Sequence, residues 1–276
     1  MRFKLPILYS MRVMIVGGSY EMSYQYLEVS IKDHVARCTM SNPPTHTMVA
    51  QEAHELYLFL DEVDSDPGVR VVVFTGGGEG VFIRHYEVGE LVAASDTVRS
   101  GAASAQKEKI FGLRDVILKM ESMDAITVAA INGSTMGGGL EFALGCDFRL
   151  QKAGEYLLGL PETGVGILPG GGGTQRLARL LGTAKALDLI LLGQVYGPEK
   201  ALDLGVVSRV FPASTFEEDV GGFVSMIAKR APRALANAKR AIREGVEMSL
   251  QPARDHLLLY LDYTKPSKNR ARNSPS

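Results

Sequence analysis

Two runs of mostly apolar residues constrain the fold of this chain more than any other feature of its sequence. Residues 69–74 and 125–131 are rich in valine, isoleucine and alanine, which is typical of strands buried on both faces of a sheet. Apolar residues recur at helical spacing in 47–63, between the two runs. Strands that alternate with helices predict an α/β fold, although periodicity alone does not say which one.

The same patterns divide the chain into four parts. We predict an extension without fixed structure over 1–23, a strand-and-helix core over 24–212, a helical region over 213–264 and a basic, disordered tail over 265–276. Further elements are expected as strands at 26–31, 35–40, 148–150, 156–158 and 206–210, and as helices at 91–123, 137–145, 175–181, 185–192, 198–204, 216–229, 233–247 and 254–263.

Composition excludes several classes of protein. The 276 residues are 46% hydrophobic and 22% charged, with a formal net charge of -1, so overall charge does not favour binding to nucleic acid or an anionic membrane. The apolar N-terminal run is interrupted by Pro6 and Arg12 and is too short to cross a bilayer. The two cysteines, Cys38 and Cys146, form no disulfide framework, which favours a reducing, cytoplasmic location.

Three glycine clusters invite a nucleotide-binding interpretation, which their spacing does not support. Val81 and Phe142 stand where a dinucleotide motif needs its third glycine. The sequence also has no phosphate-binding loop of the GxxxxGK[ST] type, and no GxSxG turn for a nucleophilic serine. His46 and His54 are eight residues apart, rather than the four that a zinc-binding helix requires. We therefore expect neither a metal nor a cofactor of the protein's own.

One glycine run opens a helix that bears a carboxylate. Gly137, Gly138 and Gly139 are followed by Leu140 and Glu141. The first N–H groups of a helix have no partner within it and can stabilise an oxyanion, and a nearby carboxylate could hold a water molecule. The structural alternative is that Glu141 only favours the helix dipole, a contribution of about 0.3–1 kcal/mol.

A second carboxylate stands in the segment Leu160, Pro161, Glu162. The proline restricts the backbone, so Glu162 projects from a stiff turn. Proline followed by glutamate is also an ordinary helix start, which is again the structural alternative. Spacing along the chain does not show whether Glu141 and Glu162 meet in space.

The longer motifs around both glutamates resemble those of the enoyl-CoA hydratase/isomerase family, also called the crotonase family. The resemblance covers roughly 24–263. Its main motifs are 130–147, 160–162, 166–177, 193–201 and 205–207, with 66–67 and 71–76 upstream.

This resemblance implies a spiral of ββα units with a C-terminal helical region that forms trimers and often hexamers. It implies an acyl-CoA substrate, with coenzyme A carried by the substrate, and no nucleic-acid or membrane partner. The catalytic residues would be Glu141 and Glu162. The oxyanion hole would be formed by the backbone N–H groups of Arg84 and Gly138. Further substrate-binding residues would be Ile83, His85, Tyr86, Gly137, Leu160 and Gly170.

One segment departs from the family pattern. Arg84, His85 and Tyr86 are bulky where relatives have small residues, and Glu87 replaces an aspartate. These side chains could narrow the substrate pocket, or they could point into a subunit contact or solvent. Both glutamates are present, and the resemblance associates that pair with the addition of water to an enoyl-CoA, which is therefore the expected reaction. Isomerisation, thioester hydrolysis, C–C cleavage and a non-catalytic binding role remain alternatives, because one fold supports many functions.

Overall fold

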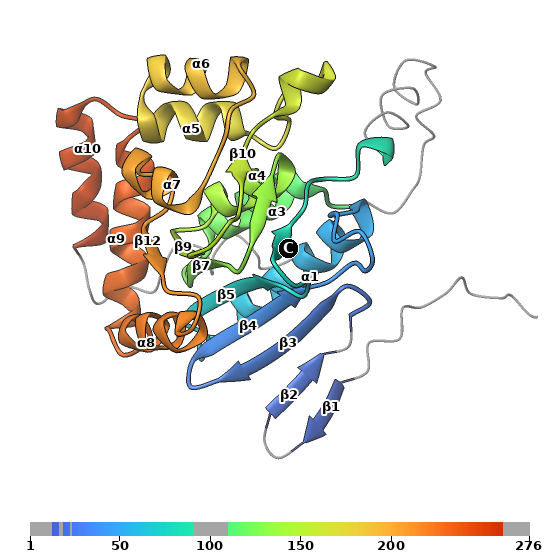
Figure 1. Ribbon diagram of the computed structural model, residues 1–276. Helices are drawn as coiled ribbons and strands as arrows, with labels where there is room; N and C mark the ends of the chain where they lie inside the picture. The colour runs from blue at the N-terminus through green and yellow to red at the C-terminus, as the bar shows by residue number, and fades with distance from the viewer. Residues whose placement is uncertain (1–12, 17–18, 23, 91–109, 262–276) are drawn as a thin grey trace, which may run out of the picture.

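The computed structural model describes residues 13–16, 19–22, 24–90 and 110–261 (Figure 1). Its largest sheet has six strands in the order β12-β9-β7-β5-β4-β3, parallel except for the antiparallel pair β3 and β4. Its strands are β3 (Leu27–Lys32), β4 (Val35–Met40), β5 (Val71–Gly76), β7 (Ile126–Ile131), β9 (Phe148–Lys152) and β12 (Arg209–Phe211).

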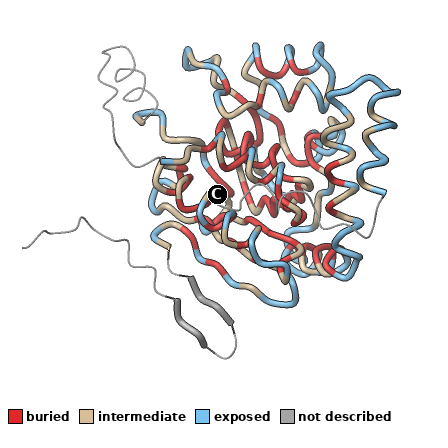
Figure 2. Tube along the Cα trace, turned by 180° about the vertical axis from the view of Figure 1, so that it is seen from behind, coloured by how far each residue is buried: buried red, intermediate tan, exposed pale blue. Residues whose placement is uncertain are grey.

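The two apolar runs form β5 and β7, adjacent strands in this sheet. Successive side chains of β5 point to opposite faces. Val72 and Phe74 face the larger core, whereas Val71 and Val73 face a second core beneath α8 (Phe216–Ala228). Both faces of the sheet are thus covered, as the apolar sequence requires (Figure 2).

A smaller sheet carries the segments that lead to the candidate site. Its order is β11-β10-β8-β6, with β6 (Val81–Ile83), β8 (Ser134–Met136), β10 (Leu158–Gly159) and β11 (Val195–Tyr196). The chain passes from β8 directly into α4 (Gly138–Gly145), every residue of which is buried. The larger core also includes residues of α1 (Ala50–Ser65) and α3 (Leu113–Ser122).

The remaining helices lie around the sheets (Figure 1). The short helix η1 (Glu162–Val165) is followed by α5 (Gly173–Leu181), α6 (Thr183–Leu191) and α7 (Pro198–Leu204). After α8, the chain continues through α9 (Pro232–Gly245), α10 (Leu250–Leu257) and η2 (Leu258–Tyr260). This mixed α/β architecture agrees with the fold class predicted from the sequence.

Most predicted elements are present with shifted ends, but β6, β8 and β11 were not predicted. Each has only two or three residues, too few for a periodic pattern to stand out. Within the extension predicted over 1–23, β1 (Val13–Val16) and β2 (Ser19–Met22) pair as an antiparallel hairpin. The tail predicted over 265–276 and much of the helix predicted over 91–123 lie outside the described residues.

Candidate functional site

The junction of β8 and α4 lies very close to backbone and side-chain atoms of neighbouring segments. Gly137 has φ 52°, in the region that favours glycine, and donates its N–H to the carbonyl of Gly159 at 3.0 Å. A Cβ on Gly138 would lie 2.7 Å from the Cβ of Tyr86. The glycine run therefore allows the start of α4 to pack directly against the segment that follows β6.

Glu141 lies in the first turn of α4 and is only 3% exposed. Its Oε1 accepts a hydrogen bond of 2.7 Å from the backbone N–H of Gly173, at the start of α5. Burial raises the pKa of this carboxyl, and the N–H groups of Gly173 and Gly171 and the charge of Arg176 oppose that rise. The glycine loop of 170–173 thus supplies the backbone N–H groups that interact with this buried carboxylate.

Glu162 is half-buried at the first position of η1. A Cβ on Gly137 would lie 3.1 Å from its Oε1, so the carboxyl stands over the glycine run. Its Oε2 is buried and has no hydrogen-bond partner among the described residues. Burial, and then the charge of Glu141, raise the pKa of Glu162 to about 7, against a hydrogen bond from its own backbone.

The structure therefore brings the two glutamates into one site, which spacing along the chain could not establish. Glu141 approaches it from α4 and Glu162 from η1, and the charge of one affects the pKa of the other. Glu162 is the carboxyl better able to hold a proton near neutral pH. A pair of carboxyl groups in different protonation states suits acid–base chemistry.

The backbone of the segment after β6 forms hydrogen bonds with the backbone of His46 and Met48. The N–H of Arg84 is donated to the carbonyl of His46 at 2.8 Å, which speaks against Arg84 as an oxyanion donor. Met48 donates to the carbonyl of His85, and Glu87 donates to that of Met48, both at 2.9 Å. Because N–H groups alternate in direction along an extended chain, the N–H of Tyr86 points away from Met48.

That orientation directs the N–H of Tyr86 toward the glycine run. The nitrogen of Tyr86 lies 3.2 Å from the position that a Cβ on Gly138 would occupy. None of the hydrogen bonds between described residues uses this N–H. Tyr86, rather than Arg84, is thus the backbone donor that the structure places beside Gly138.

The other predicted binding residues have different surroundings. Ile83 and Leu160 are 2% exposed and belong to the larger core. A Cβ on Gly137 would lie 3.8 Å from the Cβ of His85, whose Nδ1 lies 2.8 Å from the carbonyl oxygen of Tyr86. Gly170 is exposed, at the start of the loop that carries the donors to Glu141.

Sequence reasoning noticed the glycines of 170–173 but did not assign Gly171 or Gly173 to the site. A Cβ on Gly171 would lie 2.9 Å from Oε2 of Glu141, and one on Gly173 would lie 3.0 Å from its Oε1. Leu113, at the start of α3, was also missed; its Cδ2 lies 3.1 Å from the Cβ position on Gly171. The signal available was the glycine run itself, since closely approached backbone requires residues without a Cβ.

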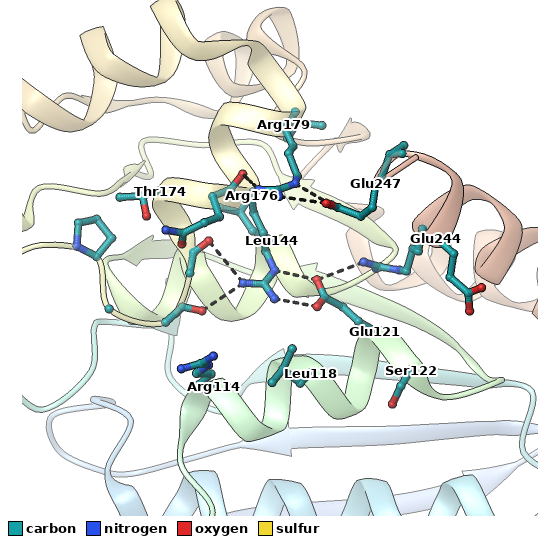
Figure 3. Close-up of a pocket in the computed structure, with 18 of the residues that line it drawn as sticks. Arg114, Leu118, Glu121, Ser122, Leu144, Thr174, Arg176, Arg179, Glu244 and Glu247 are labelled. Atoms are coloured by element: carbon teal, nitrogen blue, oxygen red, sulfur yellow. Dashed lines mark hydrogen bonds and ion pairs between the residues drawn. The ribbon is translucent and has the colours of Figure 1, made fainter. Parts of the chain in front are cut away.

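A cavity of about 1240 Å³ lies against the same glycine loop (Figure 3). Its lining includes Gly171, Gly172, Glu121, Arg176 and Arg179, but neither Glu141 nor Glu162.

Over the described ranges, no three histidine, cysteine or acidic side chains form a group that could hold a metal ion. No helix in the described part of the chain is long and apolar enough to cross a membrane.

Comparison with known sequences gives a consistent result. Residues 30–273 match the family model described as enoyl-CoA hydratase/isomerase. YngF of Bacillus subtilis, a protein named for the same family, is 31% identical over 86% of this chain and 89% of its own. The fatty acid oxidation complex subunit alpha of Shewanella putrefaciens is 36% identical over 74% of this chain, which spans only 28% of that relative's length.

Solved structures agree with the sequence comparisons. An enoyl-CoA hydratase structure from Geobacillus kaustophilus superimposes with a TM-score of 0.82 at 30% identity, covering 92% of this chain and 93% of the other. The enoyl-CoA hydratase from Bacillus anthracis gives a TM-score of 0.77 at 30% identity, covering 87% and 92%. The similarity thus extends over most of this chain and most of each solved structure.

Proposed function

Because this chain belongs to the enoyl-CoA hydratase/isomerase family, we propose that it adds water across the α,β double bond of an enoyl-CoA thioester. The observation that carries this proposal is the pair of glutamates facing one glycine-lined site. One is held by a backbone N–H group, and the other has a carboxyl oxygen with no partner among the described residues. The reaction requires no group beyond the coenzyme A that the substrate carries.

The oxyanion hole in this proposal consists of the N–H groups of Gly138 and Tyr86. Gly138 is the first residue of α4, so its N–H has no acceptor within the helix. Addition of water to an unsaturated thioester builds negative charge on the thioester oxygen, and two fixed donors stabilise that charge. Loss of one such donor costs about 3–4 kcal/mol in related acyl chemistry.

The two carboxyl groups divide the proton transfers between them. Glu141, oriented by the loop that precedes α5, positions the water molecule and removes its proton. Glu162, with a pKa of about 7, shares that water and supplies the proton to the α-carbon. Each group then acts in the protonation state that its surroundings favour.

Assembly into trimers or hexamers forms part of the same proposal. Lys239 and Arg240 of α9 are buried, whereas Ile242 on the same helix and Val246 just after it are exposed. Exposed apolar residues continue along the next helices at Leu250, Leu257, Leu258 and Leu259. Contiguous exposed apolar surface marks a protein contact, and sedimentation of the full chain would show which oligomer forms.

The decisive test is the loss of enoyl-thioester absorbance with crotonyl-CoA, measured for the wild type, Glu141→Ala and Glu162→Ala. Each substitution should lower kcat by about 10²–10⁴-fold, since each removes one acid–base group. Glu155→Ala, at an exposed position, is the matched control and should retain wild-type activity. Circular dichroism would establish that all variants are folded.

The wild-type result separates the alternatives. A wild type that binds acyl-CoA without consuming crotonyl-CoA would contradict hydration. Product analysis with other acyl-CoA thioesters would then identify isomerisation, hydrolysis or cleavage, with the bulky segment 83–87 as the first region to vary. A wild type that binds no acyl-CoA would indicate a non-catalytic role.

A further inference from the structure

The glycine loop that holds Glu141 is itself held from its opposite side. Glu141 accepts a hydrogen bond from the N–H of Gly173. On the other side, Nη1 of Arg176 donates hydrogen bonds to the carbonyl oxygens of Gly171 and Gly172, at 3.2 and 3.4 Å. The same short backbone segment therefore presents N–H groups to a carboxylate and carbonyl groups to a cation. Figure 3 shows Arg176 between this loop and α3.

Arg176 is fixed by a second set of contacts. Its Nε and Nη2 donate to the two carboxylate oxygens of Glu121 on α3, both at 2.7 Å. The two side chains are only 19% and 22% exposed. A paired, forked contact of this kind defines the orientation of the guanidinium more tightly than a single ion pair does.

The glycines of the loop 171–173 leave room for both Arg176 and Glu141. Gly172 has φ +100°, and a Cβ there would lie 2.2 Å from Nη1 of Arg176. Only glycine gives this backbone conformation without strain and leaves room for the guanidinium. The glycines at 171 and 173 leave the corresponding room for Glu141 on the other side of the loop.

We propose that Arg176 is a positioning residue, which holds the loop 171–173 so that its N–H groups orient the carboxylate of Glu141. The proposal rests on the proposed function insofar as Glu141 is the general base. Arg176 touches neither the water nor the thioester in this scheme. It acts through the peptide groups between its own side chain and that of Glu141.

The support extends to the C-terminal helices. Oε1 of Glu121 also accepts a hydrogen bond of 3.2 Å from Nη1 of Arg243 on α9. Arg243 in turn donates to Asp147 and to the carbonyl of Gly145, at the end of α4. Glu121 thus links α5 to α9, and both ends of this network connect to segments that carry or hold Glu141.

The experiment compares two arginines one turn apart on α5. Arg176→Gln removes the loop contacts, and Arg176→Lys keeps the charge but cannot reproduce the fork. Arg179→Gln is the matched control, because Arg179 forms an exposed ion pair with Glu247. For crotonyl-CoA hydration, we expect kcat to fall about 10²-fold in Arg176→Gln with little change in KM, since misplacing a catalytic group by about 1 Å costs that much. Arg176→Lys should recover part of the loss, and Arg179→Gln should stay within about twofold of the wild type.

A second measurement does not depend on hydratase activity. The carboxyl ¹³C signals of labelled glutamates, with Glu141 assigned from Glu141→Gln, report its pKa directly. The charge of Arg176 and the loop N–H groups both oppose the effect of burial on this pKa, so it should rise in Arg176→Gln and remain unchanged in Arg179→Gln.

The two measurements keep the two proposals separate. If the wild type does not hydrate crotonyl-CoA but the pKa of Glu141 rises in Arg176→Lys, which keeps the charge, as well as in Arg176→Gln, the proposed function fails and the positioning role stands. If the folded Arg176→Gln variant matches Arg179→Gln in both kcat and the pKa of Glu141, Arg176 only joins α5 to α3 and the positioning role is overturned.

Discussion

Buried charged groups have opposite surroundings at the candidate site and where α9 attaches to the core. At the attachment, Asp147 accepts from Lys239 and Arg243, both at 2.8 Å, and from the N–H of Thr127 at 2.9 Å. Lys239 also donates to the carbonyls of Met120 and Ala125. At the candidate site, an oxygen of Glu162 is buried without any partner among the described residues.

The pKa values follow this difference. Burial raises the pKa of Asp147, but Lys239 and Arg243 outweigh burial and the net shift is downward. Burial raises the pKa of Glu162 to about 7, and no cation among the described residues opposes this rise. The carboxylate of Asp147, paired with Lys239 and Arg243, stays ionised and stabilises the attachment of α9. An uncompensated carboxyl can exchange its proton at neutral pH, which catalysis needs and stability does not.

The largest expected effect comes from breaking the compensated region. Lys239→Met would leave Asp147 partly unpaired and two carbonyls without their donor. We expect the free energy of unfolding to fall by about 3–5 kcal/mol, as for other buried ion pairs that lose one partner. Urea denaturation measures this change. Lys229→Met, at an exposed position after α8, should change it by no more than about 0.5 kcal/mol.

A second substitution would confirm the cause. Adding Asp147→Asn to Lys239→Met should restore part of the loss, because it removes the uncompensated negative charge. A double variant less stable than Lys239→Met by the full effect of Asp147→Asn alone would show that the two charges do not interact.

Glu52 tests whether a buried carboxyl without a nearby cation destabilises the protein away from the candidate site. It is 3% exposed on α1, and burial, followed by the charge of Glu55, raises its pKa to about 8. The unfolded chain ionises at lower pH than the folded one, so the cost is absent below about pH 4 and grows as pH rises to 8. Glu52→Gln should therefore raise the free energy of unfolding by roughly 2 kcal/mol at pH 8.

Urea denaturation of Glu52→Gln at pH 4 and pH 8 checks this sign. The exposed variant Glu28→Gln is the control and should show no such dependence on pH. A Glu52→Gln variant that loses stability at pH 8 would show that its carboxylate is stabilised in the folded protein.

The smallest effect is expected at Glu162. Its folded pKa is also raised, so its cost likewise appears between about pH 4.5 and 7 and is fully present above that range. Because the side chain is only half-buried, solvent screening reduces the gain from Glu162→Gln to about 1 kcal/mol at pH 8. Thermal unfolding at pH 5 and pH 8 measures it.

Under the proposed function, the same variant should lose most of its activity with crotonyl-CoA. Greater stability together with lower activity is the pattern expected of a residue kept for function. Equal stability of the variant and the wild type at both pH values would place Glu162 in an environment no different from water.

The sequence by itself determined the α/β class, the two central buried strands and the family. Apolar runs such as those at β5 and β7 are typical of strands covered on both faces, because an exposed face would carry polar residues. The motifs around Gly137 and Glu162 likewise carried enough specific residues to identify both glutamates as candidates.

Only the tertiary structure decided how these candidates work together. Whether a backbone N–H group is free depends on partners far away in the chain. The N–H of Arg84 donates a hydrogen bond to the carbonyl of His46, whereas the N–H of Tyr86 faces Gly138. The contact between Glu141 and Gly173 spans 32 residues, and that between Arg176 and Glu121 spans 55. Local spacing encodes helices and strands, whereas hydrogen-bond partners at such separations are set by how those elements pack.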